Sequence, residues 1–126
     1  MFNHCTAGSD DLVASLRHLD RERIAGHPVA IRPLQAADSP DGCHALYIAG
    51  SEHMSFLRWI DRTRSRPILT ISEIRGFADA GGAIQLFRDK DRIRFRINRD
   101  AARDRGLTLS ARLLDLAVIV DTEAGR

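Results

Sequence analysis

Residues 83–97 read AIQLFRDKDRIRFRI and contain the most regular pattern in the chain. Two apolar runs are separated by the turn residues Asp89-Lys90-Asp91. In the second run apolar side chains alternate strictly with arginines, which places Ile93, Phe95 and Ile97 on one face and Arg92, Arg94 and Arg96 on the other. Because such alternation is typical of a half-buried strand, the stretch predicts a β-hairpin with one solvated face.

Upstream of this hairpin, short apolar runs alternate with segments of helical spacing. We expect strands at residues 2–6, 28–32, 43–48 and 67–71, and helices at residues 11–19, 52–64 and 72–78. Pro33 is expected to end the second strand. The second helix carries Met54, Leu57 and Ile60 at helical spacing.

Downstream of the hairpin, two further helices are expected. Asn98 is predicted to cap the first, which ends at Gly106, a residue suited to a left-handed C-terminal position. Ser110 is predicted to cap the second, which runs from Ala111 to about Val120. The whole pattern predicts one α/β domain over residues 1–126, with a mostly parallel sheet flanked by helices and a C-terminal hairpin followed by two helices.

Length and composition are those of a folded single domain. The chain has 126 residues, of which 44% are hydrophobic and 29% charged, so enough apolar surface is available to offset chain entropy and disorder is excluded. The longest apolar run, residues 116–120, is far shorter than the roughly 20 residues of a membrane helix. No secretory signal precedes the first strand, so the sequence taken by itself predicts a cytosolic protein that does not span a membrane.

Charge and motifs argue against several functions. The 19 basic and 17 acidic residues give a net charge of +2 and are interspersed, so a nucleic-acid surface is not expected. Gly81-Gly82 lacks the spacing of a phosphate-binding loop. No nucleophile, base and acid are arranged in a recognisable catalytic motif. We therefore expect no enzymatic activity, no cofactor and no metal.

The two cysteines, Cys5 and Cys43, each have a histidine neighbour, His4 and His44. Side chains alternate along a strand, so cysteines that face each other would leave both histidines pointing away, which disfavours a four-ligand zinc site. We favour a disulfide, which would close a loop worth about 4 kcal/mol of chain entropy and would require an oxidising compartment. Zinc binding and two free thiols remain the alternatives.

The last expected helix has a wide apolar arc. One side of it carries four apolar residues, namely Leu109, Leu113, Leu116 and Val120. Burial within the domain is the simplest explanation of this arc. A wide apolar helix at a chain end can also form a dimer or partner surface.

Taken in order, these segments resemble the YfiR family of bacterial periplasmic proteins. The resemblance begins with Cys5-Thr6-Ala7-Gly8 and covers nearly the whole chain. Its most specific part extends from Leu69 to Leu114. The segments that carry it are CHALYI at 43–48, PILTIS at 67–72, FA at 77–78, GGAI at 81–84, RFRIN at 94–98, AA at 101–102, GLTLS at 106–110 and LL at 113–114.

The resemblance implies a regulatory role without chemistry. Proteins of this kind are exported, non-enzymatic α/β proteins. One of them binds the periplasmic region of an inner-membrane diguanylate cyclase and represses it, which controls cyclic di-GMP signalling and biofilm formation. An outer-membrane lipoprotein and the redox state are linked to its release.

Particular residues acquire expected roles from the same resemblance. Cys5 and Cys43 correspond to a bridging pair of the family, whereas a second bridge known in some members has no cysteines here. The last helix and the hairpin become candidates for a homodimer or partner surface. A small-molecule sensor or carrier, with its ligand near the carboxyl ends of the strands, is the alternative function.

The start of the chain departs from the family pattern. Members begin with a signal peptide and a helix that precede the first cysteine-bearing strand, whereas this sequence starts inside that strand. The resemblance implies the periplasm as the location, and the sequence as written implies the cytoplasm. We expect the missing N-terminal helix to leave an apolar patch uncovered.

Overall fold

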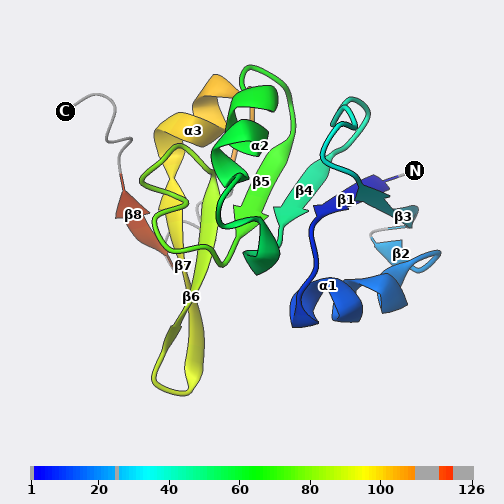
Figure 1. Ribbon diagram of the computed structural model, residues 1–126, viewed down its shortest axis with the longest axis horizontal. Coiled ribbons are helices and arrows are strands. Elements are labelled where there is room, and N and C mark those ends of the chain that lie inside the picture. Colours follow the sequence, from blue (N-terminus) through cyan, green and yellow to red (C-terminus); the bar gives the residue numbers. More distant parts are fainter. Residues whose placement is uncertain (1, 25, 110–116, 121–126) are drawn as a thin grey trace.

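The computed structural model describes residues 2–24, 26–109 and 117–120, and within them eight strands form one sheet in the order β2-β3-β1-β4-β5-β6-β7-β8 (Figure 1). Two single-turn 3-10 helices, Arg17–Leu19 and Gly50–Glu52, accompany the longer elements. In chain order these elements are β1 (Phe2–Ala7), α1 (Asp11–Leu16), β2 (Arg23–Ile24), β3 (His27–Leu34), β4 (Ala45–Ile48), α2 (Phe56–Arg62), β5 (Leu69–Ser72), β6 (Ile84–Asp89), β7 (Arg92–Asn98), α3 (Arg99–Asp104) and β8 (Val118–Val120).

The sheet is mostly parallel, as predicted. Strand β1 pairs in parallel with β3 and β4, β4 with β5, β5 with β6, and β7 with β8, while β2–β3 and β6–β7 are antiparallel. From β1 the chain moves outward to β3, and from β4 it moves the opposite way to β5 and β6. This reversal makes the sheet doubly wound, with its switch point between β1 and β4.

The reversal places helices on both faces of the sheet. Trp59 and Ile60 of α2 pack with Leu46 and Ile48 of β4 in the larger core cluster. On the other face, Val13 of α1 packs with Tyr47 and Ala49. Because Tyr47 alternates with Leu46 and Ile48 along β4, the two clusters lie on opposite faces. Figure 1 shows α2 and α3 together on one side of the sheet, with α1 apart from them.

The predicted hairpin is confirmed, although Asp89 belongs to its first strand and only Lys90 and Asp91 separate the two strands. Strands β6 and β7 pair from Ile84↔Ile97 to Asp89↔Arg92. The end of the hairpin extends beyond the rest of the sheet (Figure 1), so Ile93 is 53% exposed although it lies on the apolar face. The helix capped by Asn98 is also confirmed, since the Asn98 side chain accepts from the Ala101 N–H and the chain turns at Gly106 with φ +72°.

Pro33 does not end its strand, contrary to the prediction. It lies inside β3, opposite Thr6 of β1. Two residues earlier, the Ile31 N–H points to the outer edge of β3 and donates to Asp20 Oδ1. Pro33 has the same orientation along the strand, so its missing N–H falls on this outer edge and removes no ladder bond.

The helix expected at 52–64 begins later and buries a different face. Helix α2 starts at Phe56, after the 3-10 turn at Gly50–Glu52. As a result Met54 and Leu57 are 87% and 59% exposed, and only Ile60 of the predicted stripe enters the core. Trp59 shares that buried face.

The helix expected at 72–78 is wrong. The Ser72 hydroxyl does accept from a following backbone N–H, that of Ile74, but residues 74–81 form turns. Gly76, at φ +84°, leaves the right-handed helical region and ends any helix there. The turns are nevertheless fixed, because Ala78 N donates to Gln85 Oε1 and Asn98 Nδ2 donates to Ala78 O.

The prediction of a last helix from Ala111 to about Val120 is wrong at its C-terminal end. Residues Val118–Val120 form β8, a strand parallel to β7, as their run of β-branched side chains favours. The rest of that prediction, including Ser110, Leu113 and Leu116, lies outside the described residues. Across the part of the chain that the structure describes, no helix is long and apolar enough to cross a bilayer.

Candidate functional site

The switch point brings together the loops that follow β1 and β4. The Ser9 N–H donates to Ser51 Oγ over 2.8 Å, and the Ala49 N–H donates to the Ala7 carbonyl over 2.8 Å. These bonds hold the two loops directly against each other. In doubly wound sheets a ligand crevice commonly opens at this position.

Gly8 shows how closely the two loops approach. Its φ is +83°, and a Cβ atom at this position would lie 2.5 Å from Ser51 Oγ and 2.7 Å from Glu52 Cγ. Only glycine fits both the backbone conformation and the contact. The space directly at the switch point is therefore occupied by the protein's own side chains.

Open space lies beside the switch point, on the α1 face of the sheet. A cavity of about 280 Å³ runs between α1 and strands β1 and β4 to β7. We call it the α1 groove and define it by the residues that line it: His4, Leu12, Leu16, Tyr47, Ile71, Ile84, Leu86 and Phe95. Its walls are almost wholly apolar, so it suits an apolar side chain or an apolar ligand.

The α1 groove continues into a second, more polar cavity of about 440 Å³. The two share Leu12 and Leu86. The carboxylates of Asp10, Asp11 and Glu73 line this second cavity, together with the guanidinium of Arg88 and the side chains of Ser15 and Ile93. The open surface therefore joins an apolar trough to an end rich in carboxylates.

Asp10 holds the polar end of the groove in place. Its side chain caps α1 by accepting from the Val13 N–H at 2.9 Å, and it also accepts from the Tyr47 hydroxyl at 2.8 Å and the Gly50 N–H at 3.1 Å. Partial burial opposes ionisation of Asp10, but these hydrogen bonds outweigh it and lower the pKa of the carboxyl group.

Tyr47 forms the polar point in an otherwise apolar wall. Its hydroxyl lies 2.8 Å from Asp10 Oδ2 and 3.4 Å from Glu73 Oε2. Burial first, and then the two neighbouring carboxylates, raise the pKa of the phenol strongly. The hydroxyl is therefore a fixed donor at ordinary pH, and its proton goes to Asp10.

His4 lines the α1 groove at the end away from Glu73. Burial lowers its pKa, so the neutral ring is favoured. Its Nδ1 atom has no hydrogen-bond partner among the described residues. A neutral imidazole with an unpaired nitrogen adds one polar contact to an apolar surface.

The structure joins Cys5 and Cys43 by a disulfide, with their Cα atoms 5.9 Å apart. Both are buried on the α2 face of the sheet. His4 points to the opposite face, and His44 stacks on Phe2 with ring centroids 5.2 Å apart. With both sulfur atoms bonded to each other, neither thiolate is free to bind zinc, and the described residues contain no cluster of three or more metal-ligating side chains.

The apolar residues expected to form a partner surface are not shown to lie together on one helix. Leu109 is partly buried against the core cluster of Ala83, Ile84 and Ile97. Val120 lies in β8, and Leu113 and Leu116 lie outside the described residues.

Sequence reasoning missed the α1 groove. A groove of this kind depends on which part of a sheet face remains uncovered by helices, and a single sequence does not display that. One available signal was Tyr47, a phenol inside an apolar strand, which requires a hydrogen-bonding partner when buried.

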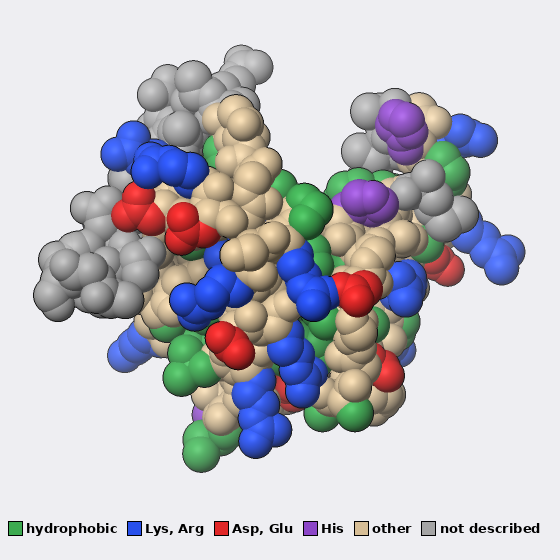
Figure 2. Space-filling model, turned by 90° about the horizontal axis from the view of Figure 1, so that it is seen from above, with side chains coloured by type: hydrophobic (Ala, Val, Ile, Leu, Met, Phe, Trp, Pro, Cys, Tyr) green, Lys and Arg blue, Asp and Glu red, His purple; other side chains and the backbone are tan. Residues whose placement is uncertain are grey.

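The distribution of charge agrees with the sequence, since acidic side chains lie among the basic ones on the face that Figure 2 shows.

Together these features define a doubly wound α/β protein with one intramolecular disulfide and an apolar groove on one face of its sheet. A family model described as YfiR/HmsC-like matches residues 1–118. The chain therefore belongs to the YfiR/HmsC-like family, as its ordered segments predicted. A search of curated proteins finds no match to the chain. Membership indicates regulation in the periplasm, directed at a diguanylate cyclase, and a regulatory rather than catalytic protein.

Proposed function

We propose that this chain is a non-enzymatic periplasmic protein that binds the periplasmic region of an inner-membrane diguanylate cyclase and represses it. Repression lowers cyclic di-GMP and with it biofilm formation. The observation that carries the proposal is the match of the YfiR/HmsC-like family over residues 1–118.

The disulfide supports the proposed compartment. Cys5 lies in β1 and Cys43 in the loop before β4, and their bond persists only where thiols are not kept reduced. The bond also anchors the loop before β4, where the side chains of Arg66 and Asp41 form an ion pair. Export of the chain would allow this bond to form.

The end of the hairpin supports contact with a partner. Ile93 is 53% exposed and lines the second, more polar cavity. Leu86 lines the same cavity. Phe95, on the same face, lines the α1 groove itself. An exposed apolar residue beside an apolar groove is typical of an interaction surface.

Leu109, Leu113, Leu116 and Val120 remain proposed as a second surface, for a homodimer. Release by an outer-membrane lipoprotein remains part of the same proposal.

Repression follows if the chain binds the inactive conformation of the cyclase more tightly than the active one, because a ligand shifts an equilibrium only by its differential affinity. A 100-fold preference corresponds to about 2.7 kcal/mol.

Binding to the isolated periplasmic region of a diguanylate cyclase from the same genome tests the proposal. Ile93→Asp places a charge in the proposed contact and should weaken binding at least about tenfold. Leu57→Asp is the matched control, because Leu57 is 59% exposed and lies on α2, on the other face of the sheet. No binding by the oxidised wild-type chain, or equal weakening by both variants, would contradict the proposal.

The α1 groove favours a second candidate function, a sensor or carrier of a small apolar molecule. Titration with the fluorescent probe anilinonaphthalene sulfonate should show saturable binding that Leu16→Trp, which fills the groove, abolishes. Probe binding that is unchanged in Leu16→Trp would argue against this second function without affecting the first.

A further inference from the structure

The hairpin of β6 and β7 ends in a two-stranded ribbon that leaves the body of the molecule. Strand β5 pairs with β6 only as far as Gln85, and β8 pairs with β7 only between Arg96 and Asn98. Residues 86–95 therefore have no third strand beside them within the described part of the chain. Figure 1 shows the turn of this hairpin at the opposite end of the molecule from α3. A ribbon in this position can contact a surface that the rest of the fold does not reach.

The end of this ribbon holds an excess of positive charge. Residues 88–96, which we call the hairpin tip, contain five of the 19 basic residues and only two of the 17 acidic residues, so their net charge is +3. The rest of the chain contains the other 14 basic and 15 acidic residues and has a net charge of −1. The small positive surplus of the whole chain is therefore located in the hairpin tip.

Most cations of the hairpin tip have no carboxylate partner. Only Arg94 is neutralised within the tip, by Asp89 at 3.0 Å. Three of the other cations are exposed, and Arg96 is half-buried with its guanidinium 5.1 Å from the centroid of the Phe87 ring. The four cations that form no ion pair with a described residue are Arg88, Lys90, Arg92 and Arg96.

These cations surround the tip and are not confined to one face. Side chains alternate along a strand, and Phe95 lines the α1 groove, so Arg92 and Arg96 point to the opposite face. Arg88 lies on the same face as the groove, since it lines the adjoining polar cavity, and Lys90 occupies the turn. A flat protein surface can reach only one face of a ribbon, whereas the headgroup layer of a bilayer can surround a projecting tip on both.

Protection against edge-to-edge pairing does not explain the sign of the charge. The free edges of the ribbon could pair with strands of other molecules, and charged side chains discourage such pairing. Either sign of charge serves that purpose, and an even mixture would leave the tip neutral. An excess of arginine and lysine is instead complementary to a surface of phosphates, because each basic side chain near an anionic bilayer adds to the attraction.

We propose that the hairpin tip docks on a bilayer surface that contains anionic phospholipids. The guanidinium groups of Arg92 and Arg96 and the ammonium group of Lys90 contact the lipid phosphates. The opposite charge of the tip and of the rest of the chain orients the molecule with its tip toward the membrane. The docked tip holds the neighbouring α1 groove near the membrane surface.

Co-sedimentation with lipid vesicles tests this proposal without any protein partner. One set of vesicles contains phosphatidylcholine alone, and the other contains phosphatidylcholine and phosphatidylglycerol in equal parts. The oxidised chain should bind the second set at least about tenfold more tightly, and added sodium chloride should weaken that binding because salt screens the charges. Lys90→Gln/Arg92→Gln should weaken it about 25-fold, which is about fivefold for each lost charge.

Arg99→Gln/Arg103→Gln is the matched control, because it removes the same charge from exposed positions of α3, at the other end of the molecule. It should leave vesicle binding within about twofold of that of the wild-type chain. All four substituted residues are exposed, so both double variants should fold, and far-UV circular dichroism checks this. Equal weakening by the two double variants would overturn the proposal, as would equal binding to the two sets of vesicles or binding to neither.

An acidic protein surface is the other class of partner that a basic tip could contact. If the wild-type chain binds no vesicles and Lys90→Gln/Arg92→Gln loses binding to the periplasmic region of the cyclase, the tip binds protein and the lipid proposal is wrong. Vesicle binding by a chain that binds no cyclase would support the lipid proposal and contradict only the proposed function.

Discussion

At the scale of single residues, Asp10 fixes the relation between α1, β4 and the switch-point loops. One carboxylate accepts from the Val13 N–H, the Gly50 N–H and the Tyr47 hydroxyl, and these donors belong to two different parts of the chain. Loss of the carboxylate leaves the Val13 and Gly50 N–H groups without this acceptor, and leaves the Tyr47 hydroxyl with only the longer contact to Glu73 Oε2 at 3.4 Å.

Asp10→Ala should therefore lower the free energy of unfolding by about 1–2 kcal/mol, the usual cost of a lost helix cap. Urea denaturation measures this change. Asp11→Ala is the control, because Asp11 is exposed and lies in the first turn of α1. A loss no larger in Asp10→Ala than in Asp11→Ala would show that the network does not stabilise the fold.

A comparison of Gly8 with Gly76 distinguishes the cost of a left-handed backbone from the cost of a steric overlap. Gly8→Ala should destabilise the protein by about 1–2 kcal/mol from the left-handed backbone and by about 1–3 kcal/mol more from overlap with Ser51 and Glu52. Gly76 has a nearly identical φ, +84° against +83° at Gly8, and a Cβ atom there would meet nothing within 4 Å. Gly76→Ala should therefore show only the backbone cost. Equal thermal melting shifts in the two variants would contradict the close contact.

Acid should destabilise the protein through His4. Because burial lowers its pKa, the folded chain resists a proton that the unfolded chain accepts below about pH 6.5. Stability should therefore fall as the pH is lowered from 7 to 5. His4→Leu should lose less stability over that range in urea denaturation, and an identical pH dependence in the two proteins would contradict this reasoning.

At the scale of elements, the disulfide is the strongest single constraint on the loop between β3 and β4. Cys5 and Cys43 are separated by 38 positions, and in the chain-entropy model their bond contributes about 4 kcal/mol. The double variant Cys5→Ala/Cys43→Ala should lose roughly this free energy of unfolding. Wild-type protein unfolded under reducing conditions should approach the same midpoint.

If reduction leaves the unfolding midpoint of the wild-type protein unchanged, the disulfide contributes nothing to stability. The removal of both cysteines together also avoids the free thiol that a single substitution would create.

Elements with a local pattern could be predicted from the sequence, and elements set by tertiary packing could not. The hairpin β6–β7 follows from alternation of Ile and Phe with Arg, and α3 follows from its Asn98 cap and the glycine at its end. The apolar residues of β8 fit both the helical and the strand period, and only the pairing with β7 distinguishes the two.

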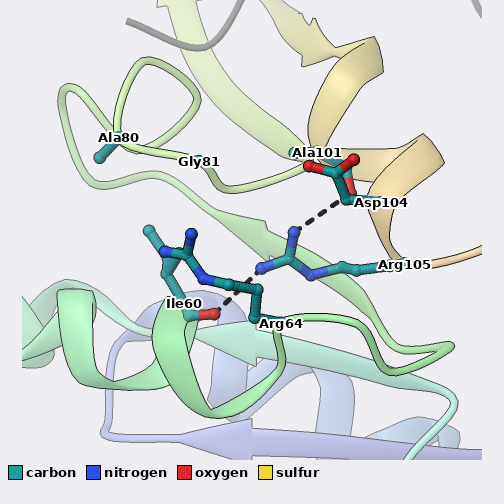
Figure 3. A pocket seen from close by; sticks show the side chains of 7 residues that line it. All are labelled: Ile60, Arg64, Ala80, Gly81, Ala101, Asp104 and Arg105. Atoms are coloured by element: carbon teal, nitrogen blue, oxygen red, sulfur yellow. Dashed lines mark hydrogen bonds between the residues drawn. The ribbon is translucent and has the colours of Figure 1, made fainter. Parts of the chain in front are cut away.

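The same distinction explains the site. Capping of α1 by Asp10 is a local contact, but its bond to Tyr47 joins residues 37 positions apart. The α1 groove depends on which part of the sheet α1 leaves uncovered. The burial of Arg105 against α2 likewise depends on tertiary packing, because its partner Ile60 lies 45 positions away (Figure 3).

At the scale of the whole molecule, the doubly wound sheet separates two functional faces. The α2 and α3 face holds the disulfide and the larger core cluster. The α1 face holds the apolar groove and the exposed end of the hairpin. This separation allows a partner to bind one face while the other maintains the fold.

The central claim is that the exported protein represses a membrane diguanylate cyclase by contact. The most direct test measures cyclic di-GMP in cells that carry the cyclase and export this chain to the periplasm, against cells that do not export it. We predict lower cyclic di-GMP with the exported chain, restored by Ile93→Asp and not by Leu57→Asp. Unchanged cyclic di-GMP in the presence of folded, oxidised protein in the periplasm would contradict the account.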